Sequence, residues 1–368
     1  MKYSYIDSIR GIAILLVILV HVSQHFQNLN QFLKPLLAYG QMGVQLFFVA
    51  SAFTLCLSSE NRIEENNKFF KFGIRRIFRI APAYYLGILL YFFINVFLNF
   101  FIEGEIKVDE KYNFLNIFLN VFFLHGFYLP ANNSIVPGGW SIATEMSFYF
   151  IFPFINIFFR KYFESSVFKI FFGFILSLIF STVCLFILEN LNFDVHGDIF
   201  FYFNIINQLP VFIIGICYFY LTKIKSIEFS VGINLLLFLF FTLLALSFSS
   251  YENNKVFFIL YKINLLPIFS GLSFVFLIEL FKKCEKLNCN ILIKIGKVSY
   301  SMYLIHFVFA DNITSLFVSK FKLVNSFYLI LFYFVSVFLT FLISIFTQKI
   351  IENKGVLLGN YLINKLDK

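Results

Sequence analysis

Charged residues are scarce in this sequence. Only 13% of its 368 residues are Asp, Glu, Lys or Arg, whereas 60% are hydrophobic and 22% are aromatic. This composition excludes a soluble globular protein and indicates a polytopic membrane protein. The net charge of +9 does not indicate nucleic-acid binding, because the basic residues lie between apolar segments, where they are expected to set topology. We therefore expect a lipid bilayer as partner and no nucleic acid.

Recognisable metal-binding and disulfide patterns are also missing. The five cysteines have no metal-ligand spacing, and three of them lie in apolar segments, so we expect reduced, structural cysteines and no metal. The sequence contains no internal repeat, and its longest polar stretch covers only residues 59–79. The function must therefore reside within the membrane or at its two faces.

Long apolar segments are abundant, and they predict an all-α membrane protein. A segment that crosses the bilayer as a helix needs about 20 apolar residues. The segment 114–130 contains His125, Gly126 and Pro130 and is short for such a span. Eleven segments are visible, at about 11–27, 41–58, 77–102, 114–130, 140–159, 167–188, 203–221, 231–250, 263–281, 298–318 and 327–348.

The positions of the basic residues predict the topology. If 114–130 does not cross and the N-terminus is cytoplasmic, 22 Lys and Arg residues lie inside and seven lie outside. If it does cross, the counts become 12 inside and 17 outside, which violates the positive-inside rule. We therefore predict about ten transmembrane helices, cytoplasmic termini, and a re-entrant or interfacial element at 114–139 on the outer side. Residues 1–353 form the membrane domain, and residues 354–368 a short cytoplasmic tail.

The first apolar segment carries ionisable residues at helical spacing. Arg10 and His21 are eleven residues apart, which places them on one helix face and about 16 Å apart along the axis. The arginine then lies at one membrane surface and the histidine about half-way through the bilayer. Ionisable groups at such depth are costly and are usually functional. The alternative is a histidine that only hydrogen-bonds a neighbouring helix.

Three further clusters are candidates for function. Arg75, Arg76 and Arg79 lie just before an apolar segment in which Pro82 fits a first-turn position. Three guanidinium groups at a helix N-terminus would form a phosphate cradle, unless they only anchor the membrane surface. In each of the other two clusters, the residues lie on one face of their own helix. They predict cavity-lining polar groups, with interhelical hydrogen bonding as the alternative. They are Ser141, Glu145 and Tyr149 after Trp140, and Ser299, Tyr303 and His306.

Six motifs in order resemble the membrane-bound acyltransferase-3 family, which includes bacterial O-acetyltransferases of lipopolysaccharide, capsule, exopolysaccharide and peptidoglycan. The resemblance covers about residues 5–353. Each motif is weak alone, but all six occur in the family's order. They are Arg10 with His21; LFFVASAF at 46–53; Arg75, Arg76, Arg79, Ile80, Pro82 and Tyr84; Trp140, Ser141, Glu145, Phe148, Tyr149 and Pro153; Ser299, Tyr300, Tyr303, Leu304 and His306; and Ile351 with Glu352.

The resemblance implies an O-acyltransferase of the bacterial inner (cytoplasmic) membrane. Acetyl-CoA would be the acyl donor from the cytoplasm, with its phosphates at the three arginines and Arg10 nearer the thioester. The acceptor would be a surface glycan or a lipid-linked sugar precursor, entering from the outer side. His21 would act as general base, oriented by Glu145, or would carry the acyl group. Ser141, Tyr149, Tyr303 and His306 would line the substrate cavity.

A proton-coupled transporter and a glycan polymerase or flippase remain alternatives from the residues alone. A transporter would use a histidine and a carboxylate in the membrane interior, but no inverted repeat is visible. A polymerase would be expected to carry a larger outer loop than the sequence offers.

Overall fold

A computed structural model gives the structure of the chain. It describes residues 3–26, 29–30, 33–104, 106–190, 199–224, 229–249, 265–322 and 325–367. Within these ranges the regular structure is helical, as the sequence predicts. The α-helices are α1 (Ser4–Ser23), α2 (Leu33–Ala38), α3 (Gly43–Glu60), α4 (Lys68–Glu103), α5 (Phe114–Val121), α6 (Gly139–Tyr162), α7 (Val167–Asn190), α8 (Ile199–Phe203), α9 (Ile205–Lys223), α10 (Val231–Ser249), α12 (Leu266–Lys283), α13 (Asn290–Lys297), α14 (Ser299–Phe307), α15 (Thr314–Phe321), α16 (Ser326–Thr347) and α17 (Asn353–Leu366).

Among the residues that the structure describes, eight helical segments are long and apolar enough to cross a membrane. Two further helices, α10 and α12, correspond to the apolar segments expected at 231–250 and 263–281, of which residues 250 and 263–264 lie outside the described residues. By contrast, α5 has eight residues and is about 12 Å long, too short to span. The eight segments are Ser4–Ser23, Leu33–Glu60, Lys68–Phe101, Gly139–Tyr162, Val167–Leu188, Phe200–Lys223, Ser299–Phe321 and Ser326–Leu366.

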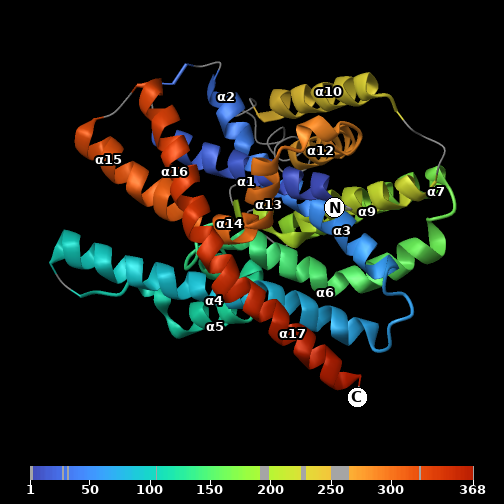
Figure 1. Ribbon diagram of the computed structural model, residues 1–368, viewed down its shortest axis with the longest axis horizontal. Coiled ribbons are helices and arrows are strands. Elements are labelled where there is room, and N and C mark those ends of the chain that lie inside the picture. Colours follow the sequence, from blue (N-terminus) through green and yellow to red (C-terminus); the bar gives the residue numbers. More distant parts are fainter. Residues whose placement is uncertain are drawn as a thin grey trace.

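Helix α1 lies at the centre of the helix bundle, and glycines let other helices approach its backbone (Figure 1). A Cβ atom on Gly296 of α13 would lie 1.7 Å from the Asp7 carbonyl oxygen. A Cβ on Gly11 would lie 2.5 Å from the Leu292 oxygen, so the α1–α13 contact depends on glycine from both sides. Side chains absent at such positions allow close helix packing. This contact holds Lys297, the last residue of α13, beside the start of α1.

The expected position of the arginine cluster at a helix N-terminus is wrong. Helix α4 begins at Lys68, so Arg75, Arg76 and Arg79 lie inside it, and Pro82 is an interior proline. Hydropathy marks where the chain enters the membrane, whereas this helix continues beyond the apolar segment. A proline at 82 has no N–H to donate to the Phe78 carbonyl. Gly355 of α17 packs against that oxygen, and a Cβ added at Gly355 would lie 2.4 Å from it.

The segment expected to be a tail is helix α17. It continues from α16 through a π-helical turn, Gln348–Glu352, and packs along α4 (Figure 1). Lys71 of α4 forms an ion pair with Asp367 just after α17. The C-terminal residues are therefore held against the end of α4 that carries the arginines.

Candidate functional site

A polar cavity of about 270 Å³ lies among α1, α3, α4, α6, α14 and the π-turn before α17. It brings together charged residues that are far apart in the sequence. Its basic residues are Arg10, Arg76, Arg79 and Lys297, and its acidic residues are Asp7, Glu145 and Glu352. Because so many ionisable groups are gathered within apolar helices, this cavity is the candidate active site.

Glu145 lies at the centre of a hydrogen-bond network. Its Oε1 accepts from the Ser51 hydroxyl at 2.6 Å and from the Tyr149 hydroxyl at 2.5 Å. Ser51 Oγ and Tyr149 Oη are also 3.2 Å apart. The four-residue spacing predicts that Glu145 and Tyr149 share a face, and the contact between their side chains confirms it. These bonds fix the carboxylate toward α3.

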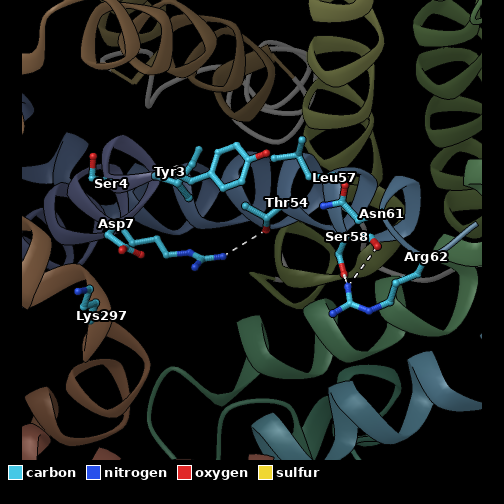
Figure 2. Close-up of a pocket in the computed structure, with 11 residues that line it drawn as sticks. Tyr3, Ser4, Asp7, Thr54, Leu57, Ser58, Asn61, Arg62 and Lys297 are labelled. Carbon is cyan, nitrogen blue, oxygen red and sulfur yellow. Dashed lines mark hydrogen bonds between the residues drawn. The ribbon is translucent and has the colours of Figure 1, made fainter. Parts of the chain in front are cut away.

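Arg10 joins this network to a second cavity of about 480 Å³ at the N-terminal end of α1. Its guanidinium donates to Thr54 Oγ1 at 3.2 Å, and Thr54 in turn donates to the Ser51 carbonyl. Asp7, Arg10 and Lys297 line both cavities. Figure 2 shows Thr54, Leu57, Ser58 and Asn61 of the α3 end on one side of the second cavity, with Asp7 and Lys297 opposite. The two cavities therefore adjoin each other at this end of the molecule.

The three arginines of α4 point in different directions. Arg76 and Arg79 line the polar cavity, and the Arg76 guanidinium lies 5.7 Å from the ring centre of Tyr149. Arg75 instead donates two hydrogen bonds to Glu65, at 2.9 and 2.7 Å, and does not line this cavity. These bonds lower the pKa of the Glu65 carboxyl below its usual value. Two of the three arginines that the sequence puts forward therefore line the polar cavity.

Ser141 and Tyr303 close the inner end of the polar cavity. Ser141 donates to Tyr303 Oη at 2.7 Å, and Tyr303 Oη donates to the Gly138 carbonyl at 3.1 Å. Ser141, Tyr149 and Tyr303 therefore line the cavity as the sequence indicates, whereas His306 does not. His306 lies behind the Tyr303 ring, with the ring centroids 5.4 Å apart.

His21 is part of a second cluster, away from Glu145. Its ring centroid lies 5.3 Å from that of His306 and 4.3 Å from that of Phe307. His21 Nδ1 is 3.3 Å from Gln24 Oε1, and Glu145 has Ser51 and Tyr149 as its hydrogen-bond partners. The structure therefore does not bring His21 and Glu145 into contact, and the expected orientation of one by the other has no geometric support.

A third cavity, of about 320 Å³, lies at the C-terminal end of α1. Gln24, the partner of His21, is one of its lining residues, with Ser23, Lys34 and Gln41. One turn after His21, His25 Nε2 lies 2.9 Å from Asp311 Oδ1 in a π-helical turn, Val308–Ile313. His21 itself lines none of these three cavities. It lies on α1 between Arg10, which lines the first two, and Gln24, which lines the third.

Several site residues escaped the reasoning from sequence. Ser51 and Tyr300 stand in the sequence only as members of the quoted motifs, and Thr54 and Lys297 gave no signal of their own. Glu352 could be found only as part of a motif, but it lines the polar cavity and accepts a hydrogen bond from Ser301. In the part of the chain that the structure describes, no three His, Cys, Asp or Glu side chains are placed to hold a metal ion.

Comparisons with known proteins give a family match and a distant relative. A family described as an acyltransferase domain (acyltransferase family 3) matches residues 3–348. The peptidoglycan O-acetyltransferase OatA of Listeria monocytogenes is 28% identical over 165 residues. That match covers 43% of this chain and 24% of the relative, so the chain matches about a quarter of the relative's length. No solved structure matches the chain significantly.

Proposed function

The chain belongs to the acyltransferase-3 family, and from this premise we propose that it is a membrane O-acetyltransferase. It moves an acetyl group from cytoplasmic acetyl-CoA to a hydroxyl of a cell-surface glycan or its lipid-linked precursor. The relative with a curated name is an O-acetyltransferase of peptidoglycan, which makes a cell-wall glycan the first acceptor to test. Lipopolysaccharide and capsule are further candidates within the same chemistry.

The observation that carries this proposal is that His21 lies on α1 between Arg10, which lines two cavities, and Gln24, which lines a third. Cavities that share Arg10 lead from the N-terminal end of α1, and another cavity reaches Gln24 from the other end. A donor and an acceptor on opposite sides of a membrane need such a meeting point. An imidazole is suited to it, because its unperturbed pKa lets it take or give a proton near neutral pH.

The polar cavity is the proposed site of the acyl donor, called the donor cavity below, and it fits a polyanionic cosubstrate. Arg76, Arg79 and Lys297 supply positive charge near the mouth, and guanidinium groups bind phosphates through paired hydrogen bonds. Arg10 lies deeper and is held by Thr54, where it would meet the pantetheine or the thioester. Arg75 is left out of this assignment, because Glu65 already occupies its guanidinium.

The roles of the reacting groups follow from the Glu145 network and from the cluster of His21 with His306. His21 removes the proton of the acceptor hydroxyl, whose oxygen attacks the thioester carbonyl, or His21 itself carries the acetyl group. Glu145 acts at the donor cavity, where it fixes Ser51 and Tyr149. Acid quenching of the enzyme with labelled acetyl-CoA separates the two routes, because only the second leaves label on the protein.

The orientation in the membrane follows the positive-inside rule. We propose ten transmembrane helices, formed by the eight long apolar segments with α10 and α12, in a bacterial cytoplasmic membrane. Both termini lie in the cytoplasm, and α5 with the chain up to residue 138 lies at the outer face. Residues 1–353 are the acyltransferase domain, and α17 is its cytoplasmic extension.

Release of free CoA thiol tests the proposed activity. The purified protein in detergent is mixed with acetyl-CoA, with and without soluble peptidoglycan fragments, and a thiol reagent records the rate. We expect release by the wild-type protein that rises with acceptor and is lost in His21→Ala. Substrate flux in proteoliposomes without any thiol release would instead identify a transporter.

A further inference from the structure

The half-buried imidazole of His21 lies beside the fully buried imidazole of His306, behind the Tyr303 wall of the polar cavity. We propose that His306 is a positioning residue for His21, and that its free Nε2 accepts a hydrogen bond from the His21 imidazolium formed during acyl transfer. This inference rests on the proposed function, because it concerns the step in which His21 takes a proton. Here His306 acts through His21 and does not bind substrate in the cavity.

The two rings share an apolar enclosure. Their centroids are 5.3 Å apart, and the Phe307 ring lies 4.3 Å from His21 and 4.2 Å from His306. The side chain of His306 is fully buried, with 0% of its surface exposed. His21 is half-buried, so only the part of its ring beside His306 and Phe307 is shielded from water. A proton on that side of the ring needs an acceptor from the protein itself.

The hydrogen bonds of His306 leave one nitrogen available as that acceptor. Its Nδ1 lies 2.7 Å from the Tyr303 carbonyl oxygen, which can only accept, so Nδ1 carries the proton and Nε2 has a lone pair. Among the described residues, Nε2 has no hydrogen-bond partner. A buried acceptor without a partner is costly to retain unless another state of the molecule uses it.

The hydrogen bond of His21 complements this arrangement. Its Nδ1 lies 3.3 Å from Gln24 Oε1, so in the neutral ring Nδ1–H donates and Nε2 is the basic nitrogen. When Nε2 takes a proton, the cation has two N–H groups. Gln24 accepts from one of them. His306 Nε2 accepts from the other once the acceptor oxygen has left it to attack the thioester.

The reaction then balances as follows. The O–H bond of the acceptor breaks as His21 Nε2 takes the proton, and the oxygen forms a bond to the thioester carbonyl carbon. The C–S bond breaks, and the thiolate takes the proton from His21 to give free CoA. His21 returns to its neutral form, and His306 stabilises only the charged state between these events. A group that acts in this way changes turnover more than donor binding.

Two substitutions of His306 separate this role from simple packing. In His306→Asn the amide lies near the former Nδ1, so the bond to the Tyr303 carbonyl is kept and nothing replaces Nε2. In His306→Gln the amide reaches the former Nε2 position, where its oxygen accepts from His21. We measure kcat and KM for acetyl-CoA by thiol release, with thermal unfolding of each purified variant as the folding control.

We expect His306→Asn to lower kcat about 10- to 100-fold, as for loss of one hydrogen bond to a charged group, with KM changed less than about twofold. His306→Gln should keep kcat within about fivefold of the wild type. Wild-type kcat in His306→Asn, or a larger loss in His306→Gln than in His306→Asn, would overturn the inference. If His306→Asn does not fold, His306→Gln decides alone, and a 100-fold loss in that variant overturns it. A wild-type protein that releases no thiol refutes the proposed function itself.

Discussion

Replacing Gly296 with alanine should force α13 away from α1 and weaken the donor cavity. The added Cβ would lie 1.7 Å from the Asp7 carbonyl oxygen and 2.5 Å from the carbonyl carbon. Ordinary van der Waals contact begins at 3.4 Å, so the first distance must double. The obstacle is backbone on a central helix, which cannot move aside as a flexible side chain could.

The expected magnitude follows from this displacement. Overpacking of a well-packed interior costs about 1–3 kcal/mol of stability. Asp7 and Lys297 both line the donor cavity, and a misplacement of 1 Å near reacting groups can lower a rate by about 100-fold. We therefore expect a lower unfolding temperature and a kcat/KM for acetyl-CoA reduced by about 10- to 100-fold.

Gly73→Ala on α4 is the matched control. No atom lies within 4 Å of a Cβ built at Gly73, so alanine should leave activity unchanged and raise helix stability by up to about 1 kcal/mol. Thermal unfolding in detergent and thiol release are measured for both variants. If Gly296→Ala matches the wild type in both measurements, the close contact between α1 and α13 is refuted.

Three further perturbations address the site and its surroundings. Glu145→Gln should lower kcat more than about 10-fold, because a neutral amide binds two hydroxyl donors less strongly than a carboxylate; unchanged kcat contradicts the network. Arg79→Lys should raise KM for acetyl-CoA several-fold, because Arg79 lines the polar cavity, whereas Arg75→Lys should not, because Arg75 is bound to Glu65. Equal effects of the two substitutions on KM would contradict this difference. Burial lowers the pKa of His125 to about 4 from 6.5, so the unfolded chain binds more protons between these values. The contribution of His125 to the free energy of unfolding should be complete above about pH 6.5 and fall by up to about 3 kcal/mol toward pH 4. This fall should be smaller in His125→Asn. Identical pH dependence of thermal unfolding in the wild type and the variant would refute this.

Features that depend on helical periodicity could be predicted from the sequence. Ser141, Glu145 and Tyr149 recur every four residues, and all three side chains line one cavity. Arg10 also lies where its spacing placed it, toward the N-terminal end of α1, where it lines two cavities. The short segment at 114–130 could be recognised because its composition and length are unsuited to a span.

Contacts between helices could not be predicted in the same way. Ser51 and Glu145 are 94 positions apart, and their hydrogen bond depends on how α3 docks against α6. The proximity of His21 and His306 likewise requires α14 to lie beside α1. Such docking is set by close-packed surfaces, including glycine contacts whose partners a single sequence does not reveal.

The directions of the α4 arginines were unpredictable for a related reason. Hydropathy placed the start of the helix at the membrane boundary, whereas the helix begins at Lys68. Since Arg75 and Arg76 are adjacent in a helix, their side chains diverge by about 100°. One guanidinium therefore meets Glu65 while the other enters the cavity.

The central claim is that acetyl transfer to a surface glycan passes through His21. Mass spectrometry of cell-envelope glycans tests it most directly, in cells that carry the wild-type protein or His21→Ala at matched membrane levels. The account predicts O-acetyl groups in the first cells and their loss in the second. Equal O-acetylation in both would contradict it.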